Sequence, residues 1–114
     1  MKRLLTILMF ISVLTTSAWA GFKNNKTGWD GMSVSEKLGY VMGFFDEHTS
    51  LSTWDSQAVM DLKLHRQNCL IDMNMNSQGL VDLVDTMYRN DVGIWKHPPF
   101  VALIQGLHEM CGEP

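Results

Sequence analysis

The chain lacks the features that nucleic-acid-binding and membrane-surface proteins carry. It has 114 residues with only two cysteines and three prolines, and its 9 Lys and Arg are outnumbered by 12 Asp and Glu. A protein that neutralises several phosphates needs a basic surplus on one face, so no nucleic acid is expected as a partner. There is no polybasic run for an anionic membrane. The length allows one domain, and an apolar content of 46% argues against a disordered chain.

Catalytic and metal-binding patterns are also missing. The four histidines are dispersed, with no H-E-x-x-H and no pair at i, i+4. The cluster Asp46-Glu47-His48 cannot converge, because consecutive residues of a helix point about 100° apart. No G-x-S-x-G elbow or glycine-rich phosphate loop is present. The sequence therefore predicts no catalytic residue, no metal, no cofactor and a role other than that of an enzyme.

Residues 1–20 have the form of a secretory signal peptide. Lys2 and Arg3 give a positive start, residues 4–14 are almost entirely apolar, and Ala18-Trp19-Ala20 is a small-x-small cleavage pattern. An uncleaved anchor is disfavoured, since a spanning helix needs about 20 apolar residues. Cleavage leaves seven basic residues against twelve acidic ones, a charge near −5. We expect an acidic periplasmic protein with no membrane segment after cleavage.

Both cysteines, Cys69 and Cys111, lie in the mature chain. Exported compartments are oxidising, so an even pair predicts one disulfide. Metal binding is the weaker reading, because two isolated thiols lack the C-x-x-C spacing that brings ligands together. The closed loop of about 43 residues would stabilise the fold by about 4 kcal/mol in the chain-entropy account.

The helical pattern begins after a polar stretch. Residues 21–32 are expected to form an N-terminal arm, and residues 33–114 the domain. Ser33-Val34-Ser35-Glu36 has the form of a capping box, and the apolar spacing that follows predicts a helix over 34–49. Gly39 and Gly43 lie inside it at a cost of about 1 kcal/mol each. Their face can serve close approach of another helix, a homodimer contact, or nothing.

The remaining elements are also expected to be helical. A helix is predicted near 55–66, capped by Asp55 or Ser52, then an extended connection over 69–76 and a helix over 77–89 capped by Asn76. After a loop, Pro98-Pro99 opens a last helix that ends at Cys111 and Gly112. The fold class is all-α, a compact bundle of four or five short helices in which one disulfide ties the start of the third helix to the end of the last.

Several of these residues fall in an order that resembles a known family. The first helix carries Tyr40-x-x-Gly43-x-x-Asp46, Cys69-Leu70 precedes the helix with Gly79 to Val84, and His97-Pro98-Pro99 opens the helix that ends at Cys111. Together they resemble the Tai-type immunity proteins of type VI secretion over residues 34–111. The stretch between Asp46 and Cys69 is long for that pattern, and Met110 stands where a proline precedes the last cysteine.

The resemblance implies a small exported helical protein that binds and blocks a peptidoglycan-cleaving amidase effector. Trp and Tyr dominate interface hot spots, so Trp54 and Trp95, in or beside the least regular segments, are the candidate partner-binding anchors. Burial in the core is the alternative for either residue. A periplasmic acid-stress chaperone, opening as carboxylates protonate, is the alternative function.

Overall fold

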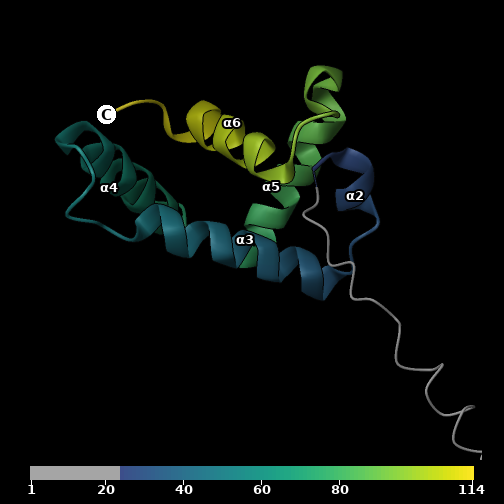
Figure 1. The fold of residues 1–114 in the computed structure, drawn as a ribbon, viewed down its shortest axis with the longest axis horizontal. Helices are drawn as coiled ribbons and strands as arrows, with labels where there is room; N and C mark the ends of the chain where they lie inside the picture. The colour runs from purple at the N-terminus through teal and green to yellow at the C-terminus, as the bar shows by residue number, and fades with distance from the viewer. Residues whose placement is uncertain (1–23) are drawn as a thin grey trace, which may run out of the picture.

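The computed structural model describes residues 24–114, and the expected signal peptide of residues 1–20 lies outside them. All regular structure in residues 24–114 is helical, which confirms the predicted all-α class (Figure 1). The elements are α2 (Lys26–Asp30), α3 (Val34–Thr49), α4 (Gln57–Asp72), α5 (Ser77–Asn90), the 3-10 turn η1 (Val92–Ile94) and α6 (Pro99–Cys111). None of these helices has the length and apolar character that crossing a membrane requires.

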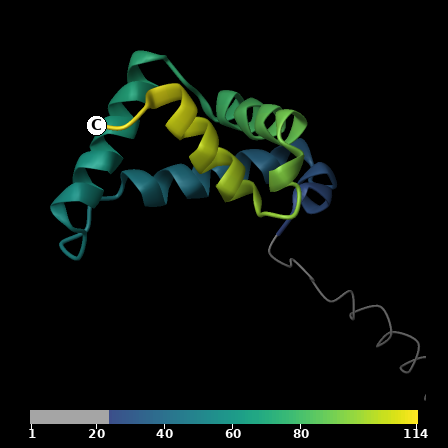
Figure 2. The ribbon, with the colours of Figure 1, turned by 90° about the horizontal axis from the view of Figure 1, so that it is seen from above.

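The core lies where α5 packs against both α6 and α3. Figures 1 and 2 place α4 at one end of the molecule and α2 at the other, with α3 running between them. The apolar face predicted for α5 is buried in this core, including Leu80, Val84 and Tyr88. It meets Leu103 and Leu107 of α6, which are also buried.

The predicted caps at the start of α3 and α5, and the predicted proline start and glycine end of α6, are confirmed. The Ser33 hydroxyl accepts from the Glu36 N–H at 3.2 Å, and the Glu36 carboxylate accepts from the Ser33 N–H at 2.8 Å, so the capping box is present. The Asn76 side chain caps α5 by accepting from the Gly79 N–H at 2.8 Å. Pro98 stands at the N-cap of α6, and Gly112, with φ of 68°, ends it.

The prediction for the α4 region was wrong at both ends. The cap is the Ser56 hydroxyl, which accepts from the Val59 N–H, and the helix continues to Asp72 where an extended connection was expected from 69. Leu70 is buried in the core, and this tertiary packing together with the Cys69–Cys111 bond holds the last turn in helical form. The disulfide therefore joins the last turn of α4, not the start of the following helix, to the end of α6.

The expected arm of residues 21–32 contains the short helix α2. The Asn25 side chain caps it, and Trp29 is fully buried with its indole N–H donating to the Asp85 carboxylate at 2.7 Å. The Lys26 N–H donates to the Trp95 carbonyl at 2.8 Å. Five residues are too few to form an isolated helix, so these distant partners hold it in place.

The predicted disulfide between Cys69 and Cys111 is confirmed. The two Cα atoms are 5.8 Å apart, within the range that this bond requires. His65 of α4 reinforces the same junction, since its Nε2 lies 2.8 Å from the Cys111 carbonyl oxygen. Covalent and polar links thus attach α4, the helix with the weakest apolar pattern, to the end of α6.

The close helix approach expected at Gly39 and Gly43 is found elsewhere. A Cβ placed on either glycine would have nothing within 4 Å, so their face is open. A Cβ on Gly106 of α6 would instead lie 2.8 Å from the Cγ and Cδ1 atoms of Leu83 in α5. The missing side chain at Gly106 is what lets α5 and α6 pack closely.

Candidate partner-binding surfaces

Residues 50–56 join α3 to α4 and are called the Trp54 loop below. The Ser52 N–H donates to the Asp55 carboxylate at 3.1 Å, and the Asp55 N–H donates to the Ser52 carbonyl at 3.0 Å. The Trp54 N–H donates to the Ser52 hydroxyl at 3.2 Å. Ser52 and Asp55, the two residues expected to cap α4, instead form hydrogen bonds with each other inside a turn.

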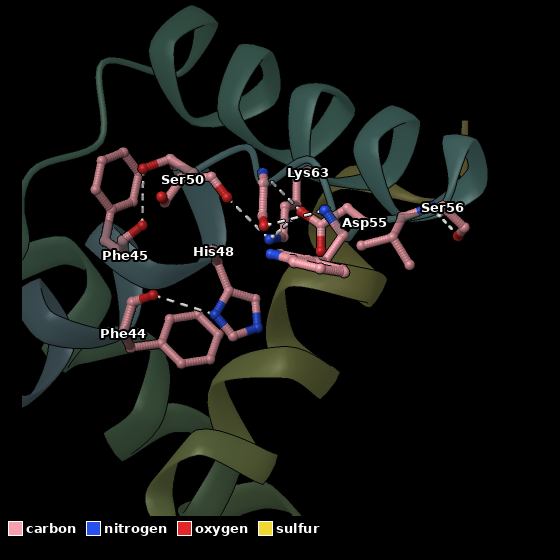
Figure 3. Close-up of polar contacts among 11 residues, drawn as sticks. Phe44, Phe45, His48, Ser50, Asp55, Ser56 and Lys63 are labelled. Carbon is pink, nitrogen blue, oxygen red and sulfur yellow. Dashed lines mark hydrogen bonds and ion pairs between the residues drawn. The ribbon is translucent and has the colours of Figure 1, made fainter.

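Lys63 of α4 ties this loop to the helix body (Figure 3). Its Nζ donates to the Ser50 carbonyl at 2.9 Å and to the Asp55 Oδ2 at 2.8 Å. The Lys63 and Asp55 side chains are only 19% and 18% exposed, so solvent screens this ion pair less than a surface pair. The Lys63 hydrogen bond and the Ser52 N–H lower the pKa of Asp55. The loop is fixed at both its start and its turn.

The ordered loop presents Trp54 to solvent. The Trp54 side chain is 94% exposed, which excludes burial in the core of residues 24–114. The neighbouring Leu51 is also exposed. Because α4 starts at Gln57, three residues after Trp54, the indole lies outside the helix.

The second candidate anchor, Trp95, lies just after η1 and is held more tightly. Its indole N–H donates to the Tyr88 carbonyl at 2.6 Å, its carbonyl accepts from the Lys26 N–H, and the Lys26 Nζ lies 5.3 Å from the ring centroid. The side chain is 44% exposed. It lines a shallow cavity of about 390 Å³. The other lining residues are Lys26, Asp30, Asp85, Tyr88 and Arg89.

The two tryptophans lie at opposite ends of α3. Both views place the Trp54 loop beside α4 at one end, and η1 beside α2 at the other (Figures 1 and 2). A helix of 16 residues is about 24 Å long. Trp54 and Trp95 therefore form two separate contact points.

The residues of the family-like motif divide into two groups. The Tyr40 hydroxyl accepts from the Phe100 N–H at 3.1 Å, which satisfies one free donor at the start of α6, next to Pro98. The His97 carbonyl accepts from the Tyr88 hydroxyl at 2.6 Å. These motif residues thus fix the entry to α6. Gly43 and Asp46 are exposed on α3 and make no part of that junction.

The titratable side chains do not assemble into a site in the described part of the chain. Asp46 and Glu47 are exposed, while His48 stacks on Phe44 at 3.8 Å between ring centroids, and its Nδ1 lies 3.1 Å from the Phe44 carbonyl oxygen (Figure 3). Burial lowers the pKa of His48. Within residues 24–114 no three His, Cys, Asp or Glu side chains are grouped as metal ligands.

A third surface is an apolar groove between α3, the end of α4 and the start of α5. Its cavity of about 360 Å³ is lined on the apolar side by Met42, Phe45, Leu70, Ile71 and Met75. Met42 and Ile71 are themselves largely exposed. Methionine side chains adapt to varied apolar ligands, so the groove suits a contact of low specificity.

The sequence singled out the two tryptophans as candidate anchors, but it did not reveal the residues that hold them in place. Lys63, Asp55 and Ser52 act together only because the loop folds back on α4, and the spacing Ser52-x-x-Asp55 was the one local signal for that turn. No family model, curated protein or solved structure matches this chain.

Proposed function

We propose that the mature protein is a periplasmic immunity protein that binds a peptidoglycan-cleaving amidase effector of type VI secretion and occludes its catalytic cleft. The motif order from Tyr40 to Cys111 supports the class of partner. The observation that carries a binding role is Trp95, a partly exposed indole fixed by its own N–H and surrounded by charged side chains.

That arrangement has the character of an interface hot spot. Such residues are enriched in tryptophan and are surrounded by groups that exclude water from the contact. Lys26, Asp30, Asp85 and Arg89 supply a rim of both charge signs around the Trp95 cavity. A protein that occludes a cleft also needs a rigid scaffold, and the Cys69–Cys111 disulfide fixes α4 to α6.

The charge of the mature chain supports a basic partner. With a net charge near −5, the protein attracts a basic, wall-binding enzyme over long range. Association should be faster at low salt and slow down as the screening length falls to about 8–10 Å near physiological ionic strength. Dissociation should respond much less to salt.

The test is peptidoglycan hydrolysis by a secreted peptidoglycan amidase found by a search of the genes adjacent to this one, with increasing amounts of the exported, oxidised protein. Inhibition should saturate near an equimolar ratio, and Trp95→Ala should weaken binding by about 2 kcal/mol or more. Circular dichroism must show that the variant is folded. Hydrolysis that continues unchanged at a tenfold excess of folded protein contradicts the proposal for that pair.

The apolar groove at Met42 and Ile71 favours one other function, the acid-stress chaperone. That function requires further apolar surface to open when Asp and Glu are mostly protonated, at about pH 2–3. An immunity protein should instead keep its near-UV signal and gain no dye-binding surface between pH 7 and about pH 4. Reversible dye binding with protection of a client protein at about pH 2–3 would support the chaperone.

A further inference from the structure

We propose that the Trp54 loop is a second, preformed docking element, in which Trp54 enters an apolar socket with a basic rim on the partner and Lys63 is its positioning residue. This inference rests on the proposed function, since the partner is the same amidase. It assigns a binding role to the stretch between Asp46 and Cys69 that is long for the family pattern.

The exposure of Trp54 is the first support. Aromatic side chains contribute the largest apolar areas to cores and interfaces, and Trp54 is a tryptophan residue with 94% relative exposure. Single exposed apolar residues are ordinary on protein surfaces. Here, however, Leu51 is exposed in the same loop, so an aromatic and an aliphatic side chain are presented together.

The order of the loop is the second support. A flexible loop loses conformational freedom when it binds, which weakens the complex. The Trp54 loop has its backbone fixed by Ser52 and Asp55, and Lys63 clamps it to α4. The conformational entropy of ordering it is therefore lost on folding, before any partner arrives.

The charge of the surrounding chain defines the socket. Residues 44–66 contain four carboxylates, of Asp46, Glu47, Asp55 and Asp61, against the two cations Lys63 and Arg66, which leaves a net charge of −2. Asp55 is neutralised by Lys63, while the other three carboxylates lie on exposed residues. A partner surface that receives Trp54 therefore meets uncompensated negative charge, which favours lysine and arginine around the socket.

The separation of the two tryptophans is compatible with one partner. A standard interface covers about 800 Å² on each protein, which is a patch about 32 Å across if it is circular. The length of α3, about 24 Å, fits within that patch. Trp54 and Trp95 can then contact the same partner at two separate points, far enough apart for their effects to be additive.

The experiment measures the affinity of the exported, oxidised protein for the amidase used in the inhibition test above. Trp54→Ala should weaken binding about thirtyfold, and the loss should multiply with that of Trp95→Ala. Leu64→Ala, which truncates another exposed apolar side chain on α4 that lines none of the three candidate surfaces, is the matched control and should change affinity less than twofold. Unfolding of each variant in denaturant checks its stability.

Lys63→Met tests the positioning role, because it keeps an aliphatic stem and removes both hydrogen bonds. It should weaken binding at least about threefold in the wild-type background and hardly at all in a Trp54→Ala background. A lysine that only stabilises the fold would change the unfolding midpoint and leave the affinity of the folded protein unaltered. Equal losses in both backgrounds overturn the positioning role.

The outcomes separate this inference from the proposed function. If the wild-type protein does not bind the amidase, both proposals fail. If the wild type inhibits and Trp54→Ala inhibits equally well, the docking loop is overturned and the proposed function stands. A thirtyfold loss for Trp54→Ala with Leu64→Ala unchanged supports the loop as a second anchor.

Discussion

Gly106 and Gly43 both lie inside helices, yet alanine at the two positions should have different effects on stability. Alanine is favoured over glycine in a helix interior by about 0.8–1.0 kcal/mol. At Gly43 nothing lies within 4 Å of the added Cβ, so Gly43→Ala should raise the free energy of unfolding by that amount. At Gly106 the new Cβ would lie 2.8 Å from Leu83 atoms that include the branched Cγ.

Overpacking of this kind costs about 1–3 kcal/mol, because the neighbour must leave its rotamer or the helices must separate. The gain in helix propensity is common to both variants and cancels in their difference. Gly106→Ala should therefore be about 1–3 kcal/mol less stable than Gly43→Ala. For a domain of this size each kcal/mol corresponds to about 4–8 °C in the melting temperature.

Thermal and urea unfolding of the oxidised protein provide the assay. Gly106→Ala should melt at least about 4 °C below Gly43→Ala. Adding Leu83→Ala should cost less in the Gly106→Ala background than in the wild type, because it removes the collision. Equal melting temperatures for the two glycine variants would refute the inference that α5 and α6 pack closely at Gly106.

Three further predictions concern the disulfide, His48 and the Tyr88 hydroxyl. Thiol titration of the unfolded, unreduced protein should find no free thiol, and replacing Cys69 and Cys111 by alanine should lower the free energy of unfolding by about 4 kcal/mol. Burial lowers the pKa of His48, so the unfolded chain takes up a proton at a higher pH than the folded protein does. The free energy of unfolding should therefore fall as pH decreases through about 6.5, the usual pKa of histidine. His48→Gln should reduce this loss in urea titrations from pH 8 to 5. Tyr88→Phe should cost about 1 kcal/mol or more in urea unfolding by leaving the His97 carbonyl without its donor, whereas an unchanged midpoint would contradict the role of this bond in the entry to α6.

The helices that the sequence predicted well are those whose information is local. α3 has a capping box and an apolar stripe, α5 an asparagine cap, and α6 a proline start and a glycine end, all within a few residues of the element. α2 and the last turn of α4 lack such signals. They are held by Asp85, Trp95 and Cys111, which lie far along the chain, so periodicity within a short window could not find them.

The surfaces follow the same distinction. Trp54 and Trp95 were chosen as candidates from residue type. The exposure of Trp54 depends on where α4 begins, and that of Trp95 on the hydrogen bond between its indole N–H and the Tyr88 carbonyl. Trp29, a third tryptophan in a polar context, is fully buried because Asp85 of α5 accepts its N–H. Nothing in the residues beside Trp29 distinguishes it from Trp54, and only the assembled helices separate a core tryptophan from a surface one.

The position of Trp54 also makes folding and binding separable in this chain. The contacts that order its loop come from Ser52, Asp55 and Lys63, all within residues 50–63, and none of them belongs to the apolar core. Removing the indole therefore leaves both the core and the loop intact. Trp95 differs, because its indole N–H donates to the Tyr88 carbonyl of α5, so its truncation removes a bond of the fold together with part of the surface. An affinity change at Trp54 can accordingly be assigned to binding alone, and the change at Trp95 only after its effect on stability has been measured.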